Sequence, residues 1–240
     1  AADLAQHYRA ARDKTVRVVP LGVGEEYLPG VPEARIRQVT ARYGLPPDYL
    51  VWVGALQPRK NLPFLIDVYA RLRQRLPEWS GLKLVLIGSK TWKSEVIAEQ
   101  VAACGVEPHV VFPGYVDGTD LPAILAGARA FVFPSLHEGF GMPAVEAMAC
   151  GTPVLAAATG ALPEVIGDAG ILLPLDAEAW VAALQRVLTD PALVADLRRR
   201  GVDRARGYTW RRCAERIVEV YREGLEGVPA CVGRVLLGRH

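Results

Sequence analysis

Residues 134–153 read PSLHEGFGMPAVEAMACGTP and join a glycine-rich loop to an apolar helical segment. The apolar residues 130–133 precede the loop, and Gly-Thr-Pro ends the helical segment before another apolar run. Gly139 and Gly141 can adopt positive φ, and without a Cβ they let a ligand approach the backbone. Pro143 suits the first turn of a helix, where its missing N–H costs nothing. The pattern predicts a strand, a ligand-binding loop, a helix and a second strand.

Two carboxylates flank this loop, Glu138 within it and Glu146 on the helix that follows. The amides and the positive dipole at the start of that helix would face an anion or a sugar hydroxyl. Glu146 stands among apolar residues, where burial of a carboxylate is costly unless it accepts hydrogen bonds. The two hydroxyls of a ribose supply such bonds, whereas an exposed position at the rim is the simpler alternative. The loop alone fits an ordinary strand–loop–helix corner equally well.

Apolar runs alternate with helical patterns between residues 49 and 173. The expected strands are apolar throughout, so helices must cover both faces of their sheet. Regular alternation predicts an α/β fold with a Rossmann-like, doubly wound parallel sheet of about six strands. Strands are expected at residues 49–53, 82–87, 110–112, 130–133, 154–157 and 171–173, with a further broken strand at 16–24. Helices are expected at residues 1–14, 34–43, 62–76, 94–104, 121–127, 142–150, 177–188, 191–206 and 210–225.

Small and polar residues follow the predicted strands, at the edge where doubly wound sheets bind ligands. Such loops suit an extended, polar, phosphorylated ligand. Arg59 and Lys60 could hold a diphosphate, with Asn61 as the N-cap of the next helix; a solvated Arg-Lys pair is the alternative. No Gly-x-Gly-x-x-Gly follows the first strand, so a dinucleotide redox cofactor is not expected. The loops occupy residues 54–60, 88–90, 113–116, 135–141 and 158–160.

Composition excludes several classes of partner. The 240 residues are 51% hydrophobic, and a net charge of +2 is too small to indicate binding to nucleic acid. No apolar run reaches the roughly 18–20 residues of a membrane span. The four cysteines are widely spaced and form no metal-ligand pattern, which favours a reducing, cytoplasmic location. Arginines crowd residues 198–222, where a solvated helix face is favoured over peripheral contact with the inner face of a membrane.

The spacing of Glu138 and Glu146 around Gly-Phe-Gly-Met-Pro resembles the Glu-x7-Glu motif of the retaining glycosyltransferases of family 4, which have the GT-B fold. Several further motifs occur in the family's order, which makes the resemblance specific. They occupy residues 19–23, 54–61, 112–116, 162–169 and 208–210, within a region of similarity that covers roughly residues 15–225.

The resemblance implies a division of the chain, because family members bind the acceptor on an N-terminal domain and the nucleotide sugar on a C-terminal one. Residues 16–225 would form the Rossmann-like nucleotide-sugar-binding domain. Residues 1–15 would be a remnant of the acceptor domain and linker, and residues 226–240 a C-terminal tail. The acceptor, a glycan or a lipid-linked sugar, would bind to the missing domain, so this domain alone is expected to bind donor and transfer nothing.

The resemblance also implies roles for individual residues. Glu138 would be catalytic by positioning the transferred sugar, and not as a covalent nucleophile. Family members need no metal or other cofactor, so none is expected here. The implied donor contacts are Arg59 and Lys60 at the diphosphate, Gly139, Phe140 and Gly141 with Glu138 at the sugar, Glu146 at the ribose, and Tyr115 and Val116 at the base.

Two positions depart from the family's pattern. Ala55 stands where many members have an arginine, so diphosphate binding would depend on Arg59 or Lys60, and Ala161 replaces a common glycine. The Pro-Arg-Lys-Asn loop at residues 58–61 is similar to members that use GDP-mannose, which favours GDP-mannose over UDP- or ADP-sugars. Two alternatives remain open: a nucleotide-sugar epimerase of GT-B type, which would need acid/base residues across the cleft, and a non-catalytic nucleotide-sugar-binding module.

Overall fold

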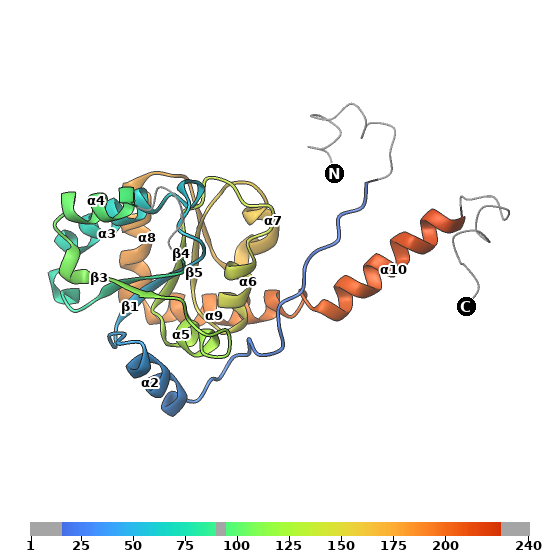
Figure 1. Ribbon diagram of the computed structural model, residues 1–240, viewed down its shortest axis with the longest axis horizontal. Coiled ribbons are helices and arrows are strands. Elements are labelled where there is room, and N and C mark those ends of the chain that lie inside the picture. Colours follow the sequence, from blue (N-terminus) through green and yellow to red (C-terminus); the bar gives the residue numbers. More distant parts are fainter. Residues whose placement is uncertain (1–15, 90–94, 227–240) are drawn as a thin grey trace. The chain divides into compact units, whose positions relative to one another are not determined.

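A computed structural model describes residues 16–89 and 95–226 of the chain (Figure 1). The chain divides into two compact units, of which the larger comprises residues 23–207 and the smaller combines the segments on either side of it. The helix expected at residues 1–14 and the expected N-terminal remnant lie outside the described residues, as does the expected tail apart from Glu226. The domain boundaries therefore stay predictions.

Six parallel strands form one sheet in the larger unit, in the order β3-β2-β1-β4-β5-β6 (Figure 1). β1 lies in the middle, where Val51 pairs with Val85 on one side and with Phe131 on the other. The winding direction reverses between β1 and β4, which is the switch point at which doubly wound sheets bind ligands. The expected doubly wound sheet is confirmed. The strands are β1 (Tyr49–Val53), β2 (Lys83–Ile87), β3 (Val110–Gly114), β4 (Ala130–Phe133), β5 (Val154–Ala157) and β6 (Ile171–Leu173).

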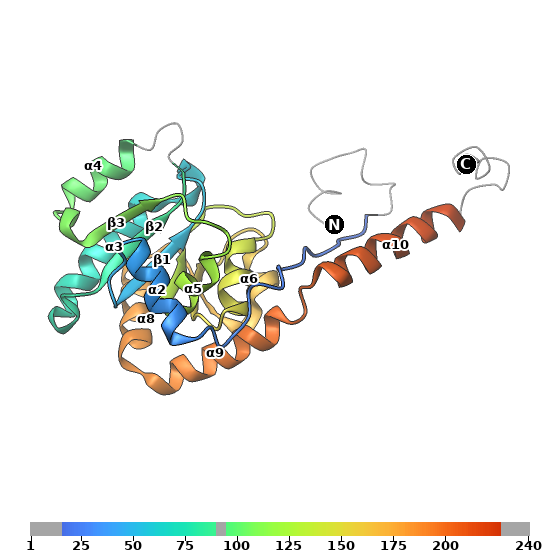
Figure 2. The ribbon, with the colours of Figure 1, turned by 60° about the horizontal axis from the view of Figure 1, so that its bottom comes forward.

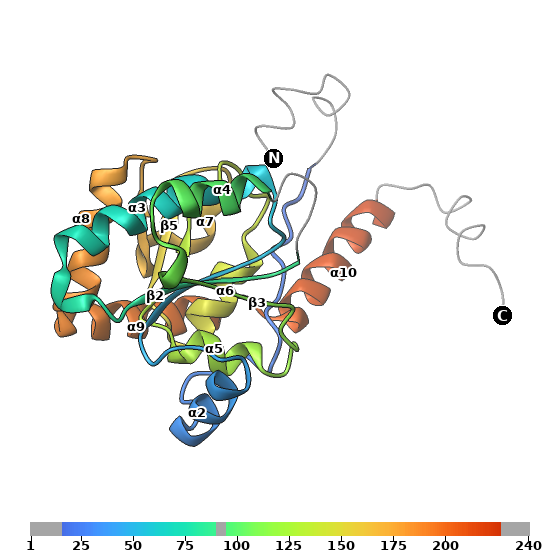
Figure 3. The same cartoon turned by 60° about the vertical axis from the view of Figure 1, so that its left-hand side comes forward.

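Helices cover both faces of this sheet. Figure 3 shows α3 (Leu62–Arg75) and α4 (Glu95–Ala103) on one side of the sheet and α5 (Leu121–Gly127) on the other. α8 (Ala177–Thr189) packs on α3, and α6 (Met142–Ala149) packs between α5 and α9 (Pro191–Ala205). Because the faces are covered, a ligand has access mainly to the strand ends. The remaining elements of this unit are α2 (Glu33–Arg42), α7 (Leu162–Ile166), and the 3-10 helices η2 (Pro58–Lys60), η3 (Pro77–Trp79), η4 (Glu107–His109) and η5 (Gly167–Ala169).

The core forms between the apolar strands and the inward faces of the helices. Trp52 of β1 and Phe131 and Phe133 of β4 have no exposed surface, and the two phenylalanine rings lie 5.4 Å apart between centroids. Tyr69 of α3 is equally buried, and its hydroxyl donates a hydrogen bond of 2.7 Å to the Leu82 carbonyl. This bond removes the cost of placing a phenolic O–H in the core.

A buried carboxylate attaches α2 to α5, which lie beside each other in Figure 2. Asp120, directly before α5, has no exposed surface. Its carboxylate accepts hydrogen bonds from Arg35 at 2.6 Å and Arg42 at 2.8 Å, and from the Tyr43 hydroxyl at 3.0 Å. Val39 is the one buried residue within α2. Electrostatic contacts, more than apolar area, therefore hold this helix in place.

The smaller unit contains α10 (Trp210–Glu226). Within this unit, Arg17 Nε donates a hydrogen bond of 3.0 Å to Glu223 Oε2. Gly22 packs directly against the backbone at Trp210, where a Cβ would have no room. The start of the described chain and its last helix thus belong to one packing unit.

The strand expected at residues 16–24 is wrong. This segment is irregular chain in which Val23 alone forms an isolated bridge. An apolar run becomes a strand only where a neighbouring strand pairs with its backbone groups, and Pro20 has no N–H to offer such a neighbour.

Candidate functional site

The loops that follow the strands meet at one edge of the sheet, because all six strands are parallel. Hydrogen bonds join loops from distant parts of the sequence. Leu136 N donates to the Arg59 carbonyl at 2.9 Å, and the Thr159 hydroxyl donates to the Ser135 carbonyl at 2.7 Å. The loops after β1, β4 and β5 therefore form a continuous rim beside the switch point.

Arg59, Lys60 and Glu138 meet on this rim and are here named the cation–carboxylate cluster. Lys60 Nζ lies 2.5 Å from Glu138 Oε1, and Arg59 Nη1 lies 3.1 Å from Glu138 Oε2. Lys60 is 6% exposed and Glu138 is 7% exposed, whereas 52% of the Arg59 side chain is exposed. One carboxylate thus faces two cations, which leaves an excess positive charge at the edge of the sheet.

The two cations keep Glu138 ionised. Burial would raise the pKa of the Glu138 carboxyl, but the hydrogen bonds from Lys60 and Arg59 and the charge of Lys60 outweigh burial and lower that pKa below its usual value. Lys60 Nζ also lies 4.9 Å from the centroid of the Phe133 ring, a cation–π contact. Lys60 is therefore a fixed ammonium group, held by an acid and an aromatic ring.

A tight turn places Lys60 at the rim. Asn61, which follows η2, adopts φ 56° and ψ 39°, the left-handed conformation. It is the one non-glycine residue with positive φ in the part of the chain that the structure describes. Asn61 occupies the N-cap of α3 as expected, but its side chain makes no capping hydrogen bond. Backbone conformations of this kind concentrate at functional sites.

Two glycines shape the loop that carries Glu138. Gly141 has φ 95° at the N-cap of α6, so this helix begins directly at the rim. Gly160, in the loop after β5, has φ 54°, and a Cβ there would lie 2.6 Å from the Glu138 backbone oxygen. Ala161 N donates a hydrogen bond of 3.0 Å to the same oxygen. Gly160 therefore sets the position of the Glu138 backbone, a role that no sequence motif indicated.

Glu146 lies one turn into α6 and is half-buried. Burial, together with the negative charge of Glu26, raises the pKa of its carboxyl to about 7. Burial and the charge of Glu146 likewise raise the pKa of the Cys150 thiol to about 12, and burial with the charges of Glu146 and Glu26 raises the pKa of the Tyr27 hydroxyl. Glu26 and Tyr27 were not expected near Glu146, because they belong to a turn-rich segment without a recognisable motif.

The other predicted donor contacts lie in loops at the same edge. Tyr115 and Val116 follow β3; Tyr115 is 80% exposed and Val116 is buried. In the loop between Glu138 and α6, Gly139 is exposed and Phe140 is half-buried. The exposed Tyr115 ring is available to stack on a planar group. The roles of these four residues stay predictions.

Across residues 16–89 and 95–226, no three His, Cys, Asp or Glu side chains lie close enough together to hold a metal ion. In the same part of the chain, no helix is both long enough and apolar enough to cross a membrane. The charges described on the rim are those of arginine, lysine and glutamate side chains.

Known proteins have sequences similar to that of this chain. The family model for glycosyl transferases group 1 matches residues 47–190. O-antigen chain mannosyltransferase B of Escherichia coli is 34% identical over 222 residues, which cover 90% of this chain and 56% of that protein. A D-inositol 3-phosphate glycosyltransferase of Salinispora tropica is 36% identical over 238 residues, covering 94% of this chain and 49% of that protein. The chain thus spans about half the length of the curated relatives it matches.

Solved structures show the same fold. Sucrose-phosphate synthase from Thermosynechococcus elongatus has a TM-score of 0.80 and 27% identity, and the match covers 95% of this chain and 57% of that one. Anabaena Alr3699/HepE, in complex with UDP and glucose, has a TM-score of 0.76 and 22% identity, with 86% of this chain and 57% of that one covered.

A C-terminal domain solved by itself matches almost over its full length. It comes from the group 1 family glycosyl transferase LpcC of Francisella tularensis, with a TM-score of 0.65 and 24% identity, and 76% of this chain and 95% of that one are covered. At this identity the likeness concerns the fold, while the family model and the relatives carry the assignment. The chain belongs to the group 1 glycosyl transferases, as a C-terminal domain of the GT-B fold.

Proposed function

We propose that this chain is the donor-binding domain of a glycosyltransferase that transfers a hexose, with mannose favoured, from a nucleoside-diphosphate sugar to a saccharide or lipid-linked acceptor. The observation that carries the proposal is the cation–carboxylate cluster beside the switch point. In it Glu138 meets Lys60 and Arg59, which lie 78 and 79 residues earlier in the sequence. A diphosphate needs cations and a sugar needs hydrogen-bond acceptors, and the cluster offers both at one place.

The proposed chemistry follows from where charge develops. When the bond between sugar and diphosphate breaks, its electron pair stays on the phosphate oxygen. Arg59, Lys60 and the positive end of α6 would stabilise that charge. Glu138 is ionised, buried and bonded to Lys60, so it would orient the sugar through its hydroxyls and not attack it. Transfer would proceed with retention and without a bound metal; full turnover by a Glu138→Gln variant of the intact enzyme would contradict this role.

Relatives support the class of donor and leave its base open. The Escherichia coli relative is a mannosyltransferase by name, whereas HepE was solved with UDP and glucose. The resemblance of the Pro-Arg-Lys-Asn loop at residues 58–61 to members that use GDP-mannose favours that donor for this chain. Tyr115 is the proposed stacking surface for the base, because its ring is the exposed aromatic group after β3.

Calorimetric titration of the chain with GDP, UDP and ADP tests the proposal. We expect saturable binding of a nucleoside diphosphate, tightest for GDP, and no sugar transfer by this chain alone. A preference for UDP or ADP would change the donor and keep the function, whereas failure to bind all three would contradict it. Incubation with GDP-mannose or UDP-glucose, followed by a search for an epimerised sugar, identifies an epimerase if one forms.

Nucleotide affinity is expected to rise with pH through neutrality. Glu146 must be ionised to accept two hydrogen bonds from the ribose, and burial and Glu26 raise its pKa to about 7. Below that pH, binding must first remove a proton, which weakens affinity by up to about tenfold per pH unit. The measurement is the Kd for GDP from about pH 5.5 to about pH 8. Glu146→Gln should bind more weakly at high pH and lose this dependence, and Glu26→Gln should shift the profile to lower pH.

The stability of the unliganded chain should depend on pH in the opposite direction, so that Glu146 makes it fall as the pH rises. The folded pKa of Glu146 lies above its ordinary value of 4.5, so the folded state binds this proton more tightly than the unfolded state. The contribution of Glu146 to stability is therefore present at low pH and is lost as the pH rises toward about 7. An unchanged pH profile in Glu146→Gln, for both binding and unfolding, would contradict the assignment.

A further inference from the structure

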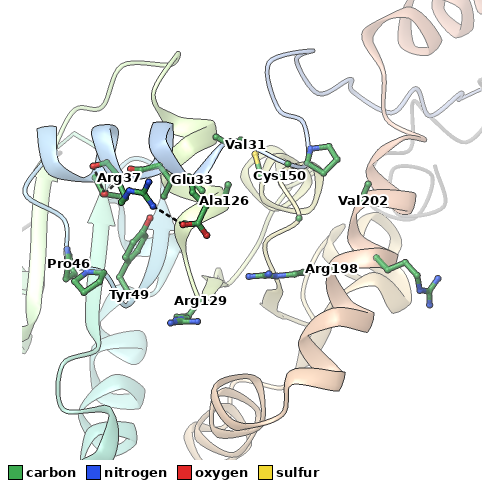
Figure 4. Close-up of a pocket in the computed structure, with 18 of the residues that line it drawn as sticks. Val31, Glu33, Arg37, Pro46, Tyr49, Ala126, Arg129, Cys150, Arg198 and Val202 are labelled. Atoms are coloured by element: carbon green, nitrogen blue, oxygen red, sulfur yellow. Dashed lines mark hydrogen bonds and ion pairs between the residues drawn. The ribbon is translucent and has the colours of Figure 1, made fainter.

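A cavity lies at the edge of the sheet opposite the cation–carboxylate cluster, and Figure 4 shows residues that line it. Tyr49 begins β1, Arg129 directly precedes β4 and Gly151 shortly precedes β5, and all three residues line this cavity. The cavity therefore lies at the amino ends of the strands, whereas the cluster follows their carboxyl ends. Its volume is about 810 Å³, within the usual range for small-molecule sites. The proposed sugar transfer makes no use of it.

The cavity is lined by more cations than acids. Five arginines from three separate parts of the chain line it, against two acidic residues. Guanidinium groups present a planar fork that matches two phosphate oxygens at once, and they keep their charge at any physiological pH. The arginines are Arg37, Arg129, Arg198, Arg199 and Arg206, and the acidic residues are Glu33 and Asp203.

Arg198 differs from the other four arginines. Figure 4 shows its side chain extending from α9 into the space between α9 and α2, where Arg129 also lies. Within the described residues, its guanidinium forms no ion pair or hydrogen bond. Arg198 is exposed, so water solvates its guanidinium, and an anion in this space would replace that water. The other arginines have acidic partners: Arg37 pairs with Glu33, Arg129 with Asp48, and Arg199 and Arg206 with Asp203.

Part of the lining is apolar. The cavity is lined by Val31 before α2, Ile36 on α2, Pro46 before β1 and Val202 on α9. A volume of about 810 Å³ also exceeds what one inorganic phosphate fills. Carbon-rich walls beside an unpaired guanidinium suit a ligand that joins an anionic group to a carbon skeleton.

We propose that this cavity binds a phosphate-bearing organic anion, with Arg198 as the residue that contacts the phosphate and the apolar wall covering the carbon skeleton. Two sources have this chemistry: a free sugar phosphate or glycerol phosphate, and the phosphoglycerol headgroup of an anionic lipid. The site lies apart from the proposed donor site, so its failure would leave the proposed function untouched.

Glycerol 3-phosphate is a suitable probe, because it carries the chemistry common to both sources. The calorimetry is done on the full chain with the substitution Lys60→Ala. This substitution removes the ammonium group of the proposed donor site, which could otherwise bind the same anion. We expect glycerol 3-phosphate to bind this protein, and the addition of Arg198→Ala to weaken binding at least about tenfold, as for loss of a charged hydrogen bond. Arg186→Ala is the matched control, since Arg186 is exposed on α8, has no partner among the described residues and does not line the cavity.

Cosedimentation with vesicles of phosphatidylglycerol in phosphatidylcholine separates the two sources. A several-fold loss of vesicle binding in Arg198→Ala, but not in Arg186→Ala, assigns the headgroup as ligand. Loss of glycerol 3-phosphate binding with unchanged sedimentation assigns a free organic phosphate. Equal behaviour of the two arginine variants in both assays would overturn the proposal, as would the absence of binding to both probes.

Discussion

Replacement of Lys60 by alanine is expected to weaken binding of a nucleoside diphosphate by about ten- to a hundredfold, the usual loss for a charged hydrogen bond. Lys60 is 6% exposed and its ammonium is fixed 2.5 Å from Glu138, so a mobile surface cation cannot replace it. Arg59 remains and should preserve weak binding. Calorimetry with GDP and guanosine measures the effect; the affinity for guanosine should change little, because the nucleoside lacks the diphosphate.

Lys83→Ala is the matched control for this prediction. Lys83 begins β2, at the far end of the strands from the cluster, and its ammonium donates a 2.8 Å hydrogen bond to the Pro108 carbonyl. It should bind GDP as the unaltered chain does. Thermal unfolding of both variants should be recorded, because Lys60→Ala also removes a partner of the buried Glu138. Unchanged GDP affinity in Lys60→Ala would mean that Lys60 serves only to hold Glu138.

Asp120→Ala is expected to lower the free energy of unfolding by about 2–4 kcal/mol. The substitution removes three hydrogen bonds that a fully buried carboxylate accepts, and with them the attachment of α2 to α5. The loss should not exceed this range, because Arg35 and Arg42 are partly exposed and regain water. Urea unfolding followed by circular dichroism measures the change.

Asp67→Ala provides the comparison for Asp120. Asp67 forms an exposed ion pair with Arg71 one turn along α3, and such pairs contribute about 0–1 kcal/mol. Asp120→Asn keeps the shape and removes the charge, so its effect should fall between those of the two alanine variants. A loss below about 1 kcal/mol in Asp120→Ala would show that apolar contacts, not this carboxylate, hold α2.

The fold was predictable because its strands are marked by local features. β1, at Tyr49–Val53, is apolar at every position and is followed by a glycine. This short sequence therefore indicates both a strand that is buried on its two faces and the turn that ends it. Residues 16–24 carry a similar signal without a neighbouring strand to pair with, and there the prediction was wrong. Apolar character in a short segment indicates burial, whereas a strand also requires a partner.

The contacts of the site were predictable only as far as topology brings loops together. The sequence indicated that Lys60 and Glu138 face a common edge, but not that they bond to each other. Nor did it place Glu26 near Glu146. Asp120 and its partners are 77 to 85 residues apart, and no periodic pattern in the sequence predicts such long-range pairs.

In the basic segment near the C-terminus, too, the sequence predicts contacts within a helix but not contacts between distant segments. Arg199 and Arg206 make the short-range charge pairs that the helical spacing predicts. Arg198 is their neighbour in sequence but makes no such pair within the described residues, and all three line a cavity that Arg37 and Arg129 also line. These five arginines come together only because α2, the start of β4 and α9 meet there.

The burial of Lys60 also decides how the protein tolerates amine chemistry. Neutral amines that solvent can reach attack dye and biotin esters, and Lys60 is 6% exposed with its ammonium held by Glu138. Accessible amino groups should therefore react well before it does. The domain can be labelled or immobilised through its amines while the rim keeps its charges, and a donor analogue carrying an amine-reactive warhead is a poor choice for tagging this site.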